Sequence, residues 1–154
     1  MLKKKYTKYT LLLIVVLFAV GIMWVFNSIP QNTSFNDLVL NHIKVSEITS
    51  IDILKFSRES SNVEEEIKVE DDNIDKIISD FSTIKLRKVS SVDVNPYRTY
   101  QLSIRTNQDN RFKIYLYEED YMEIYDAKKR ELGSYKIISD YNIETIQLYF
   151  KSLT

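Results

Sequence analysis

Alternation of apolar residues with polar or tyrosine residues between positions 100 and 125 constrains the fold of this chain more than any other feature. Successive side chains of a strand point to opposite faces of a sheet, so a period of two predicts strands with one buried face. Turn residues at 107–110 and 118–120 divide the region into three consecutive strands. The alternation therefore predicts two successive β-hairpins.

The apolar residues of these strands share one face in a single register. Directly opposed residues of antiparallel strands lie on the same face, and a slip by one residue would expose the apolar set. The predicted pairs are Tyr100–Leu116, Leu102–Ile114, Ile104–Phe112, Leu116–Met122, Ile114–Ile124 and Tyr117–Tyr121. The 118–120 loop lacks the glycine that short hairpin loops favour, which weakens this hairpin prediction, although Asp120 can adopt the left-handed conformation at an energetic cost.

The remaining segments complete a domain of mixed type. Residues 45–58, 63–69, 84–89 and 131–138 are rich in alternating or β-branched residues and predict further strands. Helical spacing of apolar residues follows Asp71-Asp72, and it recurs at the C-terminus after Ser139 or Asn142 as a helix cap. The helical apolar positions are Ile74, Ile77, Ile78, Phe81, Ile143, Ile146, Phe150 and Leu153. We expect a two-layer α+β domain with a mostly antiparallel sheet and two helices on one face.

The N-terminal part predicts a membrane anchor. An uncharged apolar run begins at Leu11, and as a helix to Ile29 it rises about 28 Å, close to the thickness of a bilayer core. Four lysines precede the run, so the positive-inside rule keeps the N-terminus in the cytoplasm. We predict a cytoplasmic basic tail (1–10), a transmembrane signal-anchor helix (11–29), a stalk (30–43) and an extracytoplasmic domain (44–154). The alternative to the anchor is a signal peptide cleaved near Ala19-Val20-Gly21. The alternative to the stalk is that its apolar residues pack on the domain: Phe35, Leu38, Val39 and Leu40.

Residue counts exclude several chemistries. The chain has no cysteine and one histidine, His42, which excludes thiol catalysis and sites with several histidines. Glycine occurs twice, too rarely for phosphate-binding glycine loops. Beyond Pro30, 17 basic residues (21 minus the four N-terminal lysines) stand against 22 acidic ones, a net charge of −5 that argues against nucleic acid as a partner. The carboxylate runs lack the spacing of calcium loops, so we expect no catalytic residues, metal or cofactor.

The tyrosines supply the one candidate binding surface. The predicted register places Tyr115, Tyr117, Tyr121 and Tyr125 opposite the core face, together with Arg105 and Lys113. Clustered tyrosines with basic residues are typical of protein recognition surfaces. The pattern alone favours the alternative that these tyrosines are only the solvent side of the sheet, because tyrosine has a high β-propensity and cross-strand aromatic pairs stabilise an exposed face. In a third arrangement, the terminal helix covers this face.

The order of these segments, with NIDKIISDF, NPYRTYQLSI, KIYLYEED and YMEIY, resembles small domains of unknown function that Gram-positive bacteria tether outside the membrane. The resemblance covers residues 45–150 and implies an α+β fold and an extracytoplasmic location, with no catalytic residues. We expect a membrane-anchored domain that binds another envelope protein non-covalently. The alternatives are an accessory or sensor subunit of an envelope membrane complex and, as the least favoured, an enzyme.

Overall fold

The computed structural model describes residues 12–22, 31–57, 60, 62–92, 98–107, 109–117, 120–141 and 144–152. The chain divides into two compact units, Met1–Gln31 and Asn32–Thr154. In the first unit, residues 12–22 form a helix, while residues 11 and 23–29 of the predicted anchor lie outside the described residues. Within the described ranges, no helix combines the length and the apolarity that crossing a membrane requires.

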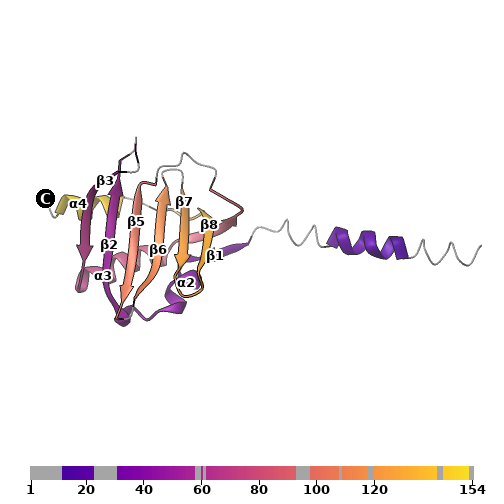
Figure 1. Ribbon diagram of the computed structural model, residues 1–154, viewed down its shortest axis with the longest axis horizontal. Helices are drawn as coiled ribbons and strands as arrows, with labels where there is room; N and C mark the ends of the chain where they lie inside the picture. Colours follow the sequence, from indigo (N-terminus) through magenta and orange to yellow (C-terminus); the bar gives the residue numbers. More distant parts are fainter. Residues whose placement is uncertain are drawn as a thin grey trace, which may run out of the picture. The chain divides into compact units, whose positions relative to one another are not determined.

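The second unit is built on one antiparallel sheet of eight strands (Figure 1). Its strands are β1 (Asn32–Ser34), β2 (Ile48–Phe56), β3 (Val63–Val69), β4 (Lys85–Val89), β5 (Tyr100–Thr106), β6 (Asn110–Tyr117), β7 (Tyr121–Asp126) and β8 (Glu131–Ile137). Their order across the sheet is β1-β4-β8-β7-β6-β5-β2-β3. The chain therefore leaves the sheet at the edge strand β3 and re-enters near the opposite edge, at β4.

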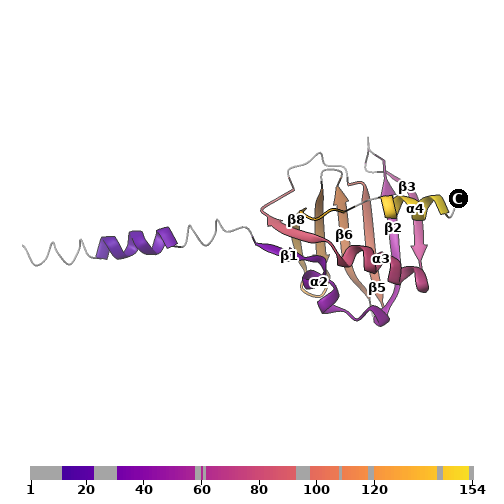
Figure 2. The same cartoon turned by 180° about the vertical axis from the view of Figure 1, so that it is seen from behind.

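Helices cover one face of this sheet. They are α2 (Phe35–Leu38), α3 (Asp72–Ser82) and α4 (Glu144–Ser152), with short 3₁₀ turns η1 (Leu40–His42) and η2 (Val45–Glu47). Figure 2 shows α2, α3 and α4 in front of the sheet, whereas the opposite view in Figure 1 shows the strands in front of them. The domain is thus α+β with two layers, as the sequence predicts.

The register predicted for the three central strands is confirmed. Leu102 lies opposite Ile114 and Ile104 opposite Phe112, while Leu116 pairs with both Tyr100 and Met122. The odd-numbered pair Tyr117–Tyr121 also forms. Asp120 has a positive φ of 57°, as expected for a short loop without glycine.

The core lies between the sheet and the helices. All four apolar residues predicted for the internal helix are buried on α3: Ile74, Ile77, Ile78 and Phe81. Phe81 joins the elements, because its ring lies 5.2 Å from that of Phe35 on α2 and 5.6 Å from that of Tyr141. On α4, Phe150 packs 5.9 Å from the ring of Tyr100 in β5. The predicted positions Asn142, Ile143 and Leu153 lie outside the described residues. Ser139 does not cap α4, because its hydroxyl accepts a hydrogen bond from the Lys85 backbone N–H.

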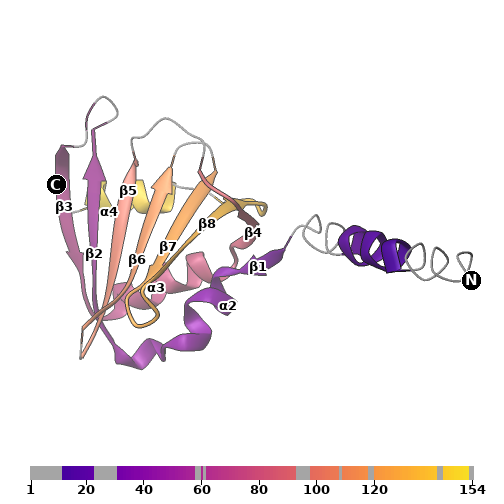
Figure 3. The same ribbon diagram turned by 45° about the vertical axis from the view of Figure 1, so that its right-hand side comes forward.

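The domain begins earlier than the predicted boundary at residue 44. β1 pairs with β4, and α2 follows directly from it (Figure 3). Phe35 and Val39 are fully buried, and the Phe35 N–H donates to the Ile84 carbonyl at 3.0 Å. From Asn32 onward, the segment predicted as a stalk is therefore part of the fold. Its polar residues obscured this in the sequence, while the alternative that Phe35 and Val39 pack on the domain is confirmed.

Candidate functional site

The face of the sheet that points away from α2, α3 and α4, here called the outer face, carries the whole predicted site. Cross-strand pairing sets Lys113 opposite Tyr125, Tyr115 opposite Glu123 and Tyr117 opposite Tyr121. The four tyrosines and Lys113 are partly exposed, and Arg105 is exposed. The third arrangement considered, in which the terminal helix covers these tyrosines, does not occur, because α4 packs through Ile146 and Phe150 into the core on the other side of the sheet.

A hydrogen-bonded carboxylate holds the centre of the outer face together. Glu123 accepts hydrogen bonds from the Tyr117 hydroxyl at 2.7 Å and from the Ser134 hydroxyl at 3.0 Å. Burial, together with this hydrogen bond and the negative charge of Glu123, raises the pKa of the Tyr117 hydroxyl well above its usual range. Tyr117 therefore acts as a fixed hydrogen-bond donor at neutral pH.

A stacked arginine forms the second feature of this face. The Arg98 guanidinium carbon lies 4.8 Å from the ring centre of Tyr115 and 5.1 Å from that of Phe56. Its Nη1 donates to the side-chain oxygen of Gln101 at 3.2 Å. Such cation–π contacts contribute about 0.5–1 kcal/mol each at partly exposed sites. They fix the orientation of the guanidinium before any partner arrives.

Sequence reasoning missed both Arg98 and Phe56. Phe56 is buried outside the main core cluster, because it lies on the same side of β2 as Asp52 and Leu54. The alternation of side chains along β2 could have predicted this, because residues 52, 54 and 56 of one strand point to the same face. The contact of Arg98 with these rings could not be predicted in the same way, because Arg98 precedes strand β5 and takes no part in its alternation.

Other charged groups surround the tyrosines. The Lys136 ammonium lies 5.8 Å from the ring centre of Tyr121. Arg105 forms an ion pair with Asp52 of the neighbouring strand β2. The tyrosine rings thus lie among cations that are held by rings or by polar side chains, an arrangement suited to non-covalent recognition.

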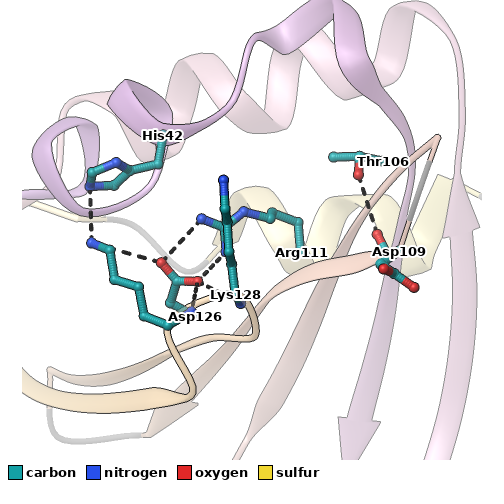
Figure 4. Close-up of polar contacts among 7 residues, drawn as sticks. His42, Thr106, Asp109, Arg111, Asp126 and Lys128 are labelled. Carbon is teal, nitrogen blue, oxygen red and sulfur yellow. Dashed lines mark hydrogen bonds and ion pairs between the residues drawn. The ribbon is translucent and has the colours of Figure 1, made fainter.

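A second polar cluster lies at the end of β7 (Figure 4). The Asp126 carboxylate forms an ion pair with Arg111 and accepts the backbone N–H groups of Lys128 at 2.9 Å and Lys129 at 3.1 Å. Only 10% of the Asp126 side chain and 14% of the Arg111 side chain are exposed. Burial acts to raise the pKa of Asp126, but the donors from Arg111 and the turn outweigh it and hold the pKa below its usual value.

This cluster is structural in character. It fixes the turn between β7 and β8, and the single histidine, His42, lies at its exposed rim with Nε2 3.4 Å from the Lys129 ammonium. The sequence indicates that Asp126 is buried, because this residue continues the alternating core-facing series of Met122 and Ile124. We missed that signal.

Two carboxylates of the predicted acidic runs form ion pairs with a lysine. Glu64 and Glu65 line an open pocket of about 710 Å³ between the ends of β2 and β3 and helix α4. Both form ion pairs with Lys55, whose ammonium also lies 6.0 Å from the ring centre of Phe150. Among the described residues, no group of histidine, aspartate or glutamate side chains is arranged to hold a metal ion.

Comparison with known proteins adds no assignment: the chain matches no protein-family model, no curated protein sequence and no solved structure.

Proposed function

We propose that this protein is a single-pass membrane protein with a cytoplasmic N-terminus, and that its extracytoplasmic α+β domain binds another envelope protein through the outer face. The observation that carries the proposal is the segregation of the two faces of the sheet. Every described helix of the domain packs on one face. The other face keeps its four tyrosines partly exposed beside basic residues.

The composition of the outer face supports protein recognition over catalysis. Tyrosine and arginine are the residues that most often dominate binding energy at protein interfaces. Here the Tyr115 ring is held by Arg98 and the Tyr117 hydroxyl by Glu123, so ordering them on binding costs little conformational entropy. The Tyr117 and Ser134 hydroxyls both donate to Glu123, and this network orders the centre of the outer face for recognition.

A triple replacement tests this proposal. We expect Tyr115→Ser, Tyr117→Ser and Tyr125→Ser in one full-length chain to abolish recovery of the partner after chemical crosslinking in the producing cells. The matched control replaces three exposed residues of the helical side, in the variant Asn73→Ser, Lys76→Ser, Leu148→Ser, which should recover the partner as the wild type does. Thermal melts followed by circular dichroism establish that both variants fold. Partner recovery by the folded tyrosine variant would refute the proposal.

A second candidate is an accessory or sensor subunit whose anchor helix itself contacts a membrane partner. The early start of the domain favours it, because β1 begins at Asn32, just beyond the predicted end of the anchor at Ile29, and leaves little room for an independent stalk. Exchanging residues 11–29 for an unrelated anchor distinguishes the two candidates. Only the accessory subunit loses its function in that exchange.

A further inference from the structure

The part of the outer face that runs from β5 to β1 is basic, although the domain as a whole is acidic, and acidic outer-face residues such as Asp52 and Glu66 lie on β2 and β3. Basic side chains lie on or over this face along the strands from β5 to β1: Lys85, Arg87, Arg98, Arg105, Lys113 and Lys136. Glu123 is the acidic side chain that the described strands from β5 to β1 place among them. The chain beyond Pro30 nevertheless has a net charge of −5, from 17 basic and 22 acidic residues.

On the helical side, helix α3 carries the opposite charge. Helix α3 has Asp72, Asp75 and Asp80 against the single base Lys76, and Asp71 precedes it. Charges of one sign concentrated on one face steer partners of the other sign toward it. The segregation of charge thus matches the segregation of helices and tyrosines.

The basic groups of the outer face are largely available to a partner. In the described part of the chain, no carboxylate forms an ion pair with Arg87, Lys113 or Lys136, whereas Arg105 is neutralised by Asp52. Arg87 donates only to the side-chain oxygen of Asn32, at 3.3 Å. Glu123 is held by hydrogen bonds from Tyr117 and Ser134, and its single negative charge offsets only part of the positive charge around it.

We infer that the partner presents an acidic protein segment to the outer face, whose carboxylates pair with Arg87, Lys113 and Lys136 around the tyrosines. This inference rests on the proposed function and names the chemistry of the partner. Arg98 adds a guanidinium that lies within 5.1 Å of the ring centres of both Phe56 and Tyr115, and a guanidinium can bind a carboxylate through two parallel hydrogen bonds.

A protein fits this face better than an anionic lipid surface does. The Glu123 carboxylate is fixed in the middle of the basic residues, where a continuous layer of anionic headgroups would meet it. A folded partner places a neutral or basic group opposite Glu123 and acidic groups around it. Complementary charge patterns of this kind give protein interfaces their specificity.

Photo-crosslinking with charge reversal tests the inference. The full-length chain carries a photoreactive amino acid at position 125 and is activated in the producing cells. The test variant combines Arg87→Glu, Lys113→Glu and Lys136→Glu, and the control combines Lys44→Glu, Lys76→Glu and Lys128→Glu, which change the net charge equally but lie away from the outer face. Mass spectrometry identifies the crosslinked segment.

We expect the outer-face reversal to lower the yield of the crosslinked protein at least about tenfold, with the control within about twofold of the wild type. The crosslinked segment should carry a net negative charge. An unchanged yield in the outer-face variant would overturn the inference while leaving the proposed function intact. An adduct of lipid mass in place of a protein would also overturn it. The absence of any adduct in the wild type would refute the proposed function itself.

Discussion

The buried Arg111–Asp126 pair provides the sharpest test of how this sheet is held together. Asp126→Asn preserves the shape of the side chain and removes its charge. In the wild type, the carboxylate accepts from Arg111 and from two backbone N–H groups of the β7–β8 turn. The replacement leaves the Arg111 guanidinium, with 14% of its side chain exposed, without its counter-charge.

The structure sets the size of the effect. Hydrogen bonds to a charged acceptor contribute about 1.5–3 kcal/mol, against about 0.5–1.5 kcal/mol for neutral ones. The variant loses this difference in hydrogen-bond energy for each of three donors. It regains the cost of burying the charge of Asp126, so the net loss of stability is about 2–4 kcal/mol. For a domain of this size, that lowers the melting temperature by about 8–16 °C.

The pH dependence has a definite sign. The pKa of Asp126 is lower in the folded domain than its usual value, so its stabilisation is complete above the unfolded pKa of about 3.9. The stabilisation is lost as the pH falls through the lower, folded pKa. We therefore expect the difference between wild type and Asp126→Asn to be full at pH 7 and to shrink below about pH 4.

Chemical denaturation of the full chain in non-ionic detergent, followed by circular dichroism, measures this difference. The matched control is Asp52→Asn: 14% of the Asp52 side chain is exposed, but half of the side chain of its partner Arg105 is exposed, so water can solvate the guanidinium and the replacement should cost less than Asp126→Asn. An Asp126→Asn variant within about 0.5 kcal/mol of the wild type at pH 7 would refute the reasoning.

Three further predictions follow from single residues. Asp71 precedes α3 with φ 53° and ψ −137°, a backbone conformation that glycine adopts more easily, and its side chain makes no capping hydrogen bond. Asp71→Gly should therefore stabilise the domain by about 1 kcal/mol, whereas the control Asp72→Gly, inside the helix, should destabilise it. Chemical denaturation measures both changes. The Tyr141 hydroxyl is buried without a hydrogen-bond partner in the described part of the chain, and burial, then the nearby Asp80, raises its pKa. Tyr141→Phe should therefore be neutral or stabilise the domain by up to about 1 kcal/mol at pH 7, and a clear destabilisation would contradict this. Above pH 10 the tyrosine of the unfolded chain ionises more readily than the buried one, so the variant should lose less stability there than the wild type does. A Cβ at position 133 would lie 2.7 Å from the buried Tyr135 ring, so Gly133→Ala should cost about 1–3 kcal/mol in thermal melts, and an unchanged melting temperature would show that the ring yields freely.

The sequence predicted those parts of the fold that burial dictates locally. Ile104, Ile114 and Met122 reach the core only in one register, and the four apolar residues of α3 fit only a helix. The order of the strands was beyond this reasoning, because the pairing of β4 with β8 joins segments far apart in sequence and leaves no periodic trace. β1 and α2 were missed because each is too short to show a period, even though Phe35 is fully buried.

The candidate site divides in the same way. Strand parity placed Tyr115, Tyr117, Tyr121 and Tyr125 together on one face. It did not show that Arg98 stacks on Tyr115, or that Glu123 links Tyr117 to Ser134, since such contacts depend on side-chain reach across strands. These contacts define how the face presents its charges, and they required the three-dimensional structure.

The central claim is that the outer face, and not the helical side, meets a protein partner. The most direct measurement compares a photoreactive amino acid at Lys113, on the outer face, with one at Lys76, on α3, in the full-length chain in the producing cells. The account predicts a discrete protein adduct at position 113 and none at position 76. An adduct at position 76 with none at position 113 would contradict it.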